Sequence, residues 1–357
     1  MKIYKIVSQR AKAQGTPDLY VGIDVHLKTW HVTILHDGVT LFSSGIPGQW
    51  DVLRKLLDHY KGYRIHAVYE AGYFGYGLRD RLIAYGASCL VAAPSLILQQ
   101  RGNRVKTDRR DSKKLALLLS QALLIGVVVP TEEERSHLAV IRRRHQLVKD
   151  CVRIQLRIKA EFRFHDLPFP EIKGKWSKTF VENLHRFQFK DRWLQESFQR
   201  LLAQYDHLVE EIAKQTKLIE ELAKTDYYRE SVKILRTIPG IGLLIAMEFL
   251  VELQNIRRFH RADQLAAYVG LTPAQYSSGE HIRMGNITHI GKGQLRAFLI
   301  EASWVLIRKD PAMAQKYQTL KYRSGSKRAI VAIARKLLVR ARRVLLDRTP
   351  YVFGKAA

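Results

Sequence analysis

The sequence predicts an α/β domain near the amino terminus, followed by a mainly helical remainder. Three observations support this prediction. Three strand-like runs rich in apolar residues follow one another between residues 20 and 45. Helix-like and strand-like runs then alternate as far as residue 92. Beyond Pro130, apolar residues recur at helical spacing almost without interruption.

Five strands are predicted in the first part of the chain: Tyr20–His26, Trp30–His36, Val39–Gly45, Ile65–Glu70 and Ala87–Ala92. Asp37-Gly38 is a typical two-residue hairpin turn between the second and third strands. Helices are predicted between the later strands, at Gln49–Tyr60 and Gly75–Tyr85. Three antiparallel strands followed by alternating helix and strand is the order of an RNase H-like α/β fold, which we place at residues 19–130.

The charge of the chain indicates a polyanionic partner. There are 60 Lys and Arg against 33 Asp and Glu among 357 residues, a net charge of +27. This excess disfavours an ordinary metabolic enzyme and favours DNA or RNA first, and an anionic membrane second. No apolar run reaches the length of a membrane-spanning helix, so we expect no membrane partner.

The cysteine content and the first residues favour a cytoplasmic protein. Cys89 and Cys151 are the only cysteines, which argues against a disulfide framework and against a structural zinc site. Residues 1–18 are basic but lack the continuous apolar segment of a secretory signal. We expect them to form a flexible lead-in.

Residues 131–228 are predicted to be a helical connector. The second of its two long helices carries a seam whose spacing alternates between four and three: Leu201, Tyr205, Leu208, Ile212, Gln215, Ile219 and Leu222. This spacing predicts a coiled-coil hairpin. Contact with a second copy and packing within the chain explain the seam equally well. Gln215 would fix the register or the number of partners.

Residues 229–357 are predicted to form a mainly helical domain that begins with two apolar helices joined by a Pro-Gly turn. This arrangement resembles a helix-hairpin-helix, in which Gly240 and Gly242 would let backbone amides approach a phosphate. A buried turn between helices is the competing explanation. A polar loop is expected from Ser277 to Gly293, with Arg283 and Lys292 as phosphate contacts. The basic segment from residue 321 to 348 predicts an amphipathic helix that packs its apolar side.

Four carboxylates occur where the predicted elements could bring them together. Asp24 lies inside the apolar first strand, where a buried charge is costly unless it meets a cation or hydrogen bonds. Glu70 ends the fourth strand, and Asp108 and Asp111 are three residues apart at the entry to a helix. Oxygen ligands of this kind select Mg²⁺ or Mn²⁺, which suits phosphodiester chemistry.

Each acid also has a simpler explanation. Asp24 could face solvent by strand alternation, Glu70 could merely end its strand, and Asp108 could be the N-cap of an ordinary charged helix start. The surrounding basic residues favour the metal-and-phosphate interpretation. The phosphate contacts expected there are Arg104, Lys106, Arg109 and Arg110.

Local sequence around these acids resembles a family of insertion-sequence transposases. The matching segments are GIDVH at Asp24, YEAGYFGYGLRDRL at Glu70 and NRVKTDRRDSKKLA at Asp108 and Asp111. They resemble the DEDD tetrad of that family's RuvC-like domain. VGLTPAQYSSG and GNITHIGKGQLR resemble its carboxyl-terminal domain, where a serine preceding glycine is the covalent nucleophile. The resemblance implies Ser278 for this role, with Ser277 as the alternative because the two serines are adjacent.

The resemblance implies a DNA transposase or recombinase that cuts and rejoins DNA strands. Mg²⁺, or Mn²⁺, would be held by the four acids, and a phosphoserine intermediate would form. The implied partners are the DNA of element ends and target and a guide (bridge) RNA; we also expect a dimeric or tetrameric homo-oligomer, and a prokaryotic, nucleoid-associated location. The alternatives are a junction-resolving or structure-specific endonuclease that uses water, and a non-catalytic architectural protein that binds nucleic acid.

Overall fold

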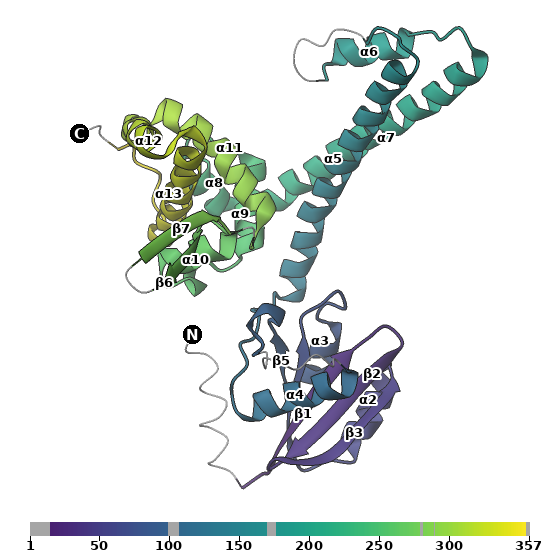
Figure 1. Cartoon of the computed structure of the whole chain (residues 1–357), viewed down its shortest axis with the longest axis vertical. Coiled ribbons are helices and arrows are strands. Elements are labelled where there is room, and N and C mark those ends of the chain that lie inside the picture. Colours follow the sequence, from purple (N-terminus) through teal and green to yellow (C-terminus); the bar gives the residue numbers. More distant parts are fainter. Residues whose placement is uncertain (1–14, 99–106, 170–175, 279–280, 289, 355–357) are drawn as a thin grey trace. The chain divides into compact units, whose positions relative to one another are not determined.

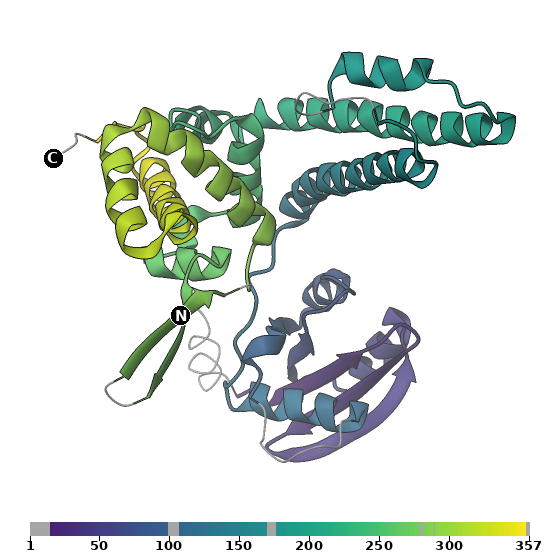
Figure 2. The same ribbon diagram turned by 45° about the horizontal axis from the view of Figure 1, so that its top comes forward.

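The computed structural model describes residues 15–98, 107–169, 176–278, 281–288 and 290–354. The chain divides into two compact units, residues 1–129 and 130–357 (Figures 1 and 2). Most of the expected lead-in lies outside the described residues, and the first strand begins at Asp18. Within the described part, no helix is both long enough and apolar enough to cross a bilayer.

Unit 1 contains a five-stranded mixed sheet and its helices. Its main elements are β1 (Asp18–Val25), β2 (Thr29–His36), β3 (Val39–Pro47), α2 (Trp50–Asp58), β4 (Arg64–Glu70), α3 (Gly77–Ala84), β5 (Ser88–Ala92) and α4 (Asp108–Ser120). The strand order is β3-β2-β1-β4-β5. The β1–β2 and β2–β3 pairs are antiparallel, whereas β1–β4 and β4–β5 are parallel. The predicted strands and both predicted helices are confirmed, with ends that differ by up to two residues.

Alternate residues of β1 point to opposite faces of this sheet. Val21 and Ile23 are fully buried in the core that includes Leu53 of α2 and Leu82 of α3. The other face packs on α4, where Val68 belongs to a separate cluster with buried leucines of that helix. The sheet is therefore covered on both faces, with α4 on the face toward which Gly22 points.

Gly22 lets α4 lie directly on β1. A Cβ atom at this position would be 2.0 Å from the backbone oxygen of Ser112 and 2.6 Å from the amide nitrogen of Ala116. Ser112 is fully buried, and its Oγ lies 2.8 Å from both Thr33 Oγ1 and His31 Nδ1 on β2. The first turns of α4 are thus fixed against two neighbouring strands.

Unit 2 is mainly helical and has one small sheet. Its main elements are α5 (Glu132–Phe164), α6 (Lys178–Arg186), α7 (Arg192–Ala223), α8 (Arg229–Leu235), α9 (Leu243–Leu253), α10 (Ala262–Val269), β6 (Pro273–Ser278), β7 (His281–Ile287), α11 (Gly293–Lys309), α12 (Pro311–Ser324) and α13 (Ser326–Asp347).

Helices α5 and α7 form a long hairpin and run side by side (Figures 1 and 2). Tyr205 and Ile219 of the predicted seam are buried. Gln215 Nε2 donates a hydrogen bond of 2.9 Å to the backbone oxygen of Val140 on α5. The seam therefore packs within the chain, and Gln215 fixes the register of α7 on α5.

The loop predicted from Ser277 to Gly293 is wrong, because its first part is a β-hairpin. β6 and β7 pair antiparallel, with Ser277 opposite Ile282 and Ser278 opposite His281. Serine and glycine favoured the loop interpretation, but pairing the two segments satisfies their backbone groups, which would otherwise need other partners. The basic terminal helix is confirmed as α13, although it begins only at Ser326. Gly325, with φ 79°, separates it from α12.

Buried charges connect α9 to α5 and to the start of α11. Lys292 Nζ lies 2.6 Å from Glu252 Oε2, and Arg142 Nη2 lies 3.5 Å from Glu252 Oε1. Glu248, one helical turn earlier, is 1% exposed, and its Oε2 lies 3.4 Å from His145 Nε2. Burial raises the pKa of Glu248 to about 8, and the charge of Glu252 adds to this effect.

Replacing Gly22 with alanine should destabilise unit 1. The added methyl group meets backbone atoms of α4, which cannot move aside as a flexible side chain can. We expect a loss of about 1–3 kcal/mol, measured as a lower midpoint of urea unfolding. Gly45→Ala is the matched control, because a Cβ atom on this β3 residue meets nothing within 4 Å. Equal midpoints for the two variants would contradict the close contact.

The pH dependence of unfolding should change in the Glu248→Gln variant. In the unfolded chain Glu248 ionises near the ordinary glutamate pKa of 4.5, whereas in the folded protein it stays protonated up to about pH 8. Folding is therefore progressively disfavoured as the pH rises from about 5 to 8, by up to roughly 1.4 kcal/mol per pH unit from this group. Glutamine cannot ionise and removes this contribution. Urea unfolding across this range tests the difference, and parallel curves for the two proteins would refute it.

A candidate metal centre at the edge of the sheet

Asp24 and Glu70 lie at the same level on neighbouring strands. The last paired residues of the parallel strands β1 and β4 are Ile23 and Tyr69, and the two acids follow them directly. Neighbouring residues at one level of a parallel pair point to the same face. For Asp24 this is the α4 face, because Gly22, two residues earlier, points there. Asp24 is partly buried, with 21% of its side chain exposed, and Glu70 is exposed.

Helix α4 supplies the other two acids from its first turns. The N-cap is Thr107, so Asp108 is the first helical residue and the interpretation of Asp108 as the N-cap is wrong. The extended backbone of Thr107, with φ −143° and ψ 144°, places the helix start one residue earlier than that interpretation requires. Asp111 follows one turn later and is partly buried. Both acids are favoured by the positive end of the helix dipole.

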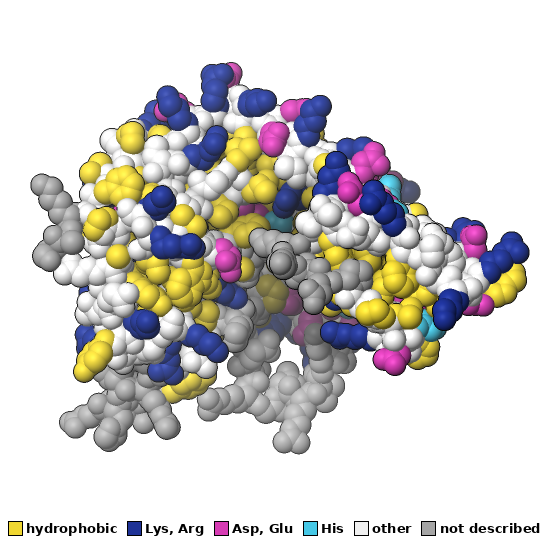
Figure 3. Space-filling view, turned by 90° about the horizontal axis from the view of Figure 1, so that it is seen from above, with side chains coloured by type: hydrophobic (Ala, Val, Ile, Leu, Met, Phe, Trp, Pro, Cys, Tyr) yellow, Lys and Arg dark blue, Asp and Glu magenta, His cyan; other side chains and the backbone are white. Residues whose placement is uncertain are grey.

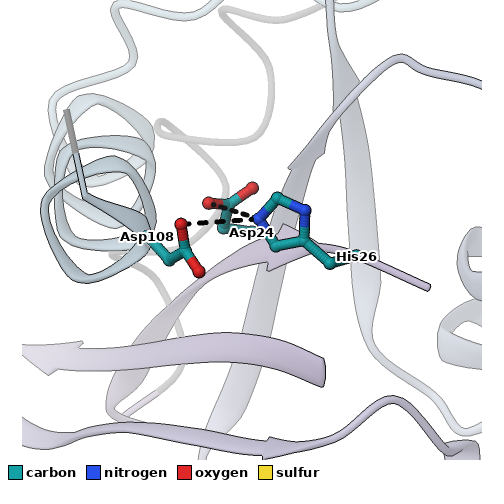
Figure 4. Close-up of side chains that lie close together, drawn as sticks. All are labelled: Asp24, His26 and Asp108. Carbon is teal, nitrogen blue, oxygen red and sulfur yellow. Dashed lines mark ion pairs between the residues drawn. The ribbon is translucent and has the colours of Figure 1, made fainter. Parts of the chain in front are cut away.

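Three side chains meet at this edge: Asp24 and Asp108 with His26, which follows β1 (Figure 4). His26 Nε2 lies 3.3 Å from Asp24 Oδ2 and 3.6 Å from Asp108 Oδ1. One possible ligand atom from each residue lies within 4.8 Å of the others. This spacing allows a single cation to contact all three.

The electrostatics of Asp24 favour a bound cation. Burial raises the pKa of this carboxyl group, and the nearby charges of Asp108 and Asp111 raise it further, whereas His26 lowers it. An ionised Asp24 is thus costly in this environment. A divalent cation would offset both the burial and the repulsion among the carboxylates.

Glu70 and Asp111 lie outside this close group of three. Glu70 is placed by the strand register at the level of Asp24, and the charge of Asp111 acts on Asp24. The structure therefore brings Asp24 and Asp108 into direct proximity and places the other two acids around them. All four belong to unit 1.

The candidate nucleophile lies in unit 2. Ser278 is the last residue of β6, and Ser277 precedes it; their side chains lie outside what the structure describes, as does that of Arg283 on β7. The backbone places Arg283 opposite Tyr276 in the hairpin. Both candidate serines thus lie at the end of β6 that pairs with the start of β7.

The remaining predicted phosphate contacts have different surroundings. Arg104 and Lys106 lie outside the described residues, and Arg109 and Arg110 are exposed on the first turn of α4. Lys292 is paired with Glu252, so its charge is already largely balanced. More generally, Lys and Arg side chains are spread over the whole face drawn in Figure 3.

The two glycines of the Pro-Gly turn differ in their surroundings. Gly240 has φ 92°, and a Cβ atom there would lie 2.3 Å from the backbone oxygen of Ala302 on α11. Close packing against this helix thus accounts for Gly240 without a phosphate. Gly242 is exposed, and a Cβ atom there would meet nothing within 4 Å.

Two residues that build the centre, His26 and Ser112, were not predicted from the sequence. His26 stands two residues after Asp24 and just beyond the end of β1, so strand alternation would place it on the same face as Asp24. Ser112 directly follows Asp111 and fixes α4 to His31 and Thr33. Burial lowers the pKa of His31, which favours its neutral form in this network. A small polar residue one position after a candidate acid was the only signal for Ser112.

Comparison with known proteins places both units in one group of transposases. A DEDD-type transposase family of IS110 elements matches residues 21–164, and the family described as "Transposase IS116/IS110/IS902 family" matches residues 232–318. Together the two matches cover well over half of the chain. The four acids lie in the first match, and Ser278 lies in the second.

Individual relatives agree with this assignment. The chain is 32% identical over 243 residues to a putative transposase, y4qE, of Sinorhizobium fredii, a match that covers 67% of this chain and 58% of the relative. It is 29% identical over 333 residues to the transposase for insertion sequence element IS1533 of Leptospira borgpetersenii, covering 90% and 94%. For the transposase of IS1111A from Coxiella burnetii, identity is 29% over 240 residues, covering 65% and 64%. The chain thus spans less than two thirds of the first and third of these relatives. The chain belongs to the IS116/IS110/IS902 family of transposases.

Proposed function

We propose that this protein is the DNA transposase of an insertion sequence, which cuts and rejoins DNA strands. The observation that carries the proposal is the group of Asp24, His26 and Asp108 at the sheet edge, inside the segment that matches DEDD-type transposases. The basic surface of the chain, with its net charge of +27, suits a nucleic-acid substrate.

Unit 1 would be an RNase H-like, RuvC-like domain. Its sheet order β3-β2-β1-β4-β5, with two antiparallel and two parallel pairs, supports this proposal. In such a sheet the carboxyl ends of β1 and β4 meet at one edge, and α4 covers that edge from one face. Domain boundaries at residues 19–130, 131–228 and 229–357 would then separate this domain, the helical connector and the serine-bearing domain.

The acids of unit 1 would hold Mg²⁺ or Mn²⁺. The residues fit such an ion, because Asp24 and Asp108 offer oxygen ligands at suitable spacing, and Glu70 and Asp111 stand beside them. The ion would polarise the scissile phosphate and stabilise the leaving 3′ oxygen. The neighbouring Arg109 and Arg110 are exposed on α4 and can contact the phosphates that flank it.

Ser278 would be the nucleophile. Its hydroxyl oxygen forms a bond to phosphorus, and the bond from phosphorus to the DNA 3′ oxygen breaks. The serine loses its proton, and the leaving 3′ oxygen takes up a proton to become a hydroxyl. Attack by a different 3′ hydroxyl on the phosphoserine then rejoins a strand and restores the serine. If the acids and the serine act on the same phosphate, residues of both units are needed for the reaction, within one chain or between protomers of a dimer or tetramer.

A guide RNA would select the DNA, as the family resemblance implies. The protein would then supply chemistry and backbone contacts, and base pairing with the guide would supply sequence specificity. In a prokaryotic cell such a protein would work at the nucleoid.

A nuclease that uses water as nucleophile is the second candidate. The specific observation in its favour is that all four acids lie in unit 1, so metal-dependent cleavage does not itself require the serine. Trapping of a covalent adduct separates the two candidates.

Replacing Asp24 with asparagine should abolish strand cleavage while nucleic-acid binding persists. Loss of one ligand charge removes several kcal/mol of transition-state stabilisation, about 10²–10⁴-fold in rate. Cleavage of a labelled DNA substrate in Mg²⁺ measures the rate, and a gel-shift assay measures binding. Asp37→Asn, in the exposed β2–β3 turn, is the matched control. Unchanged cleavage by Asp24→Asn would contradict the role of this carboxylate, whereas binding without cleavage by the unmodified protein would favour the architectural protein.

Trapping should identify the nucleophile. Incubation with DNA followed by denaturing electrophoresis should show a protein–DNA adduct that is absent from Ser278→Ala and present in Ser277→Ala. The reverse pattern would assign the role to Ser277. Cleavage without any adduct, retained by both variants, would instead establish the water-dependent nuclease.

A further inference from the structure

A cationic pocket lies where the α5–α7 hairpin joins the rest of unit 2. It has a volume of about 550 Å³ and is formed by the end of α7, one face of α8 and the start of α9. Ala223, Val232 and Leu243 contribute apolar lining. This volume is ample for a phosphate group and part of its sugar.

Four cationic side chains line this pocket: Lys224, Arg229, Lys233 and Arg236. Three of them recur at spacings of four and three along α8 and its C-cap, so they lie on one side of that helix. Its other side is buried through Ile234 and Leu235. Glu220 is the single acid in the lining, so the pocket has a clear positive excess.

Three of these cations have no carboxylate partner within the described part of the chain. Arg229 Nη2 pairs with Asp226 at 2.6 Å. No ion pair of the described residues involves Lys224, Lys233 or Arg236, and all three are exposed. Mutual repulsion of unpaired cations makes such a pocket favourable for an anion.

The start of α9 adds backbone donors to the same pocket. Gly242 is the N-cap of α9. Because glycine has no side chain that could accept a hydrogen bond, the first amides of this 11-residue helix lack a side-chain cap. The space in front of Gly242 is open, and Leu243 lines the pocket. The start of α9 and the cations thus border the same volume.

We propose that this pocket binds a backbone phosphate of nucleic acid. The ligand is a phosphodiester group, held by Lys233, Arg236 and Lys224 around the start of α9. Gly242 takes part because it leaves the helix amides accessible, whereas Gly240 serves the packing against α11. This inference deepens the proposed function, since it gives the nucleic acid a fixed contact in unit 2, distinct from the acids of unit 1.

Binding of labelled nucleic acid to a double variant, Lys233→Ala with Arg236→Ala, tests the proposal. The probes are a 30-base-pair DNA duplex and a 30-nucleotide single-stranded RNA, titrated by fluorescence anisotropy at several salt concentrations. Each lost phosphate contact should lower the affinity about tenfold near 0.1 M salt and reduce the slope of log affinity against log salt by about 1. EDTA is present throughout, so cleavage chemistry does not enter, and failure of the proposed catalytic function would leave the result intact.

The matched control removes the same charge elsewhere in unit 2, by Arg186→Ala with Lys190→Ala. These exposed residues lie beside the first half of α7: His185, next to Arg186, pairs with Asp206, about 26 Å along the helix from Ala223 at the pocket. Loss for the DNA probe alone or the RNA probe alone identifies the source of the phosphate, and loss for both shows a shared site. Equal losses in the control, no loss in the pocket variant, or no binding by the unmodified protein would each overturn the proposal.

The Gly242→Asp variant tests whether the first backbone amides of α9 contact phosphate, and it should do so without unfolding the protein. An aspartate N-cap satisfies the first amides of α9 and favours the helix, and the open space accommodates the side chain. Its thermal unfolding midpoint should equal or exceed that of the unmodified protein, while the affinity for nucleic acid falls about tenfold or more. Unchanged affinity would show that the start of α9 does not contact phosphate.

Discussion

The close contact between α4 and β1 brings together the acids of the candidate metal centre in unit 1. Asp108 and Asp111 lie on a helix, and Asp24 lies on a strand, so their separation depends on how near the two elements approach. A side chain at Gly22 would force α4 away, because its Cβ would overlap the backbone at Ser112. A displacement of about 1 Å is enough to spoil a metal site or a catalytic geometry. The absent side chain of Gly22 thus sets the distance between ligands on different elements.

The same geometry creates an electrostatic cost that a ligand can relieve. Bringing α4 onto the sheet places the charges of Asp108 and Asp111 near a partly buried Asp24 and raises the pKa of its carboxyl group. Hydrogen bonds that join Ser112 Oγ to Thr33 Oγ1 and to His31 Nδ1 hold the helix in place despite this repulsion. Such repulsion is tolerated in a fold when it serves function. The hydrogen bonds among Ser112, Thr33 and His31 therefore keep α4 in position, and the acids remain available to a cation.

The sequence predicted the elements of unit 1 well because local signals there agree with the fold. Asp37 and Gly38, with φ 45° and 82°, form the expected hairpin turn, and apolar runs mark the buried strands. The β6–β7 hairpin was missed because Ser277, Ser278 and the glycines after them resemble loop residues. His26 was missed for another reason. Its contact with Asp108 joins residues 82 positions apart, and no local pattern encodes such a contact.

Helix α9 has polar surroundings at both of its ends. Its uncapped start lies beside unpaired cations, which makes that end suitable for an anion. Toward its other end, Glu248 and Glu252 face His145 and Arg142 of α5, and Glu252 also pairs with Lys292 before α11. The acids thus attach α9 to the long hairpin and to the segment that follows β7. A phosphate bound at the start of α9 would therefore be fixed relative to the root of the serine-bearing hairpin, since one short helix contacts both.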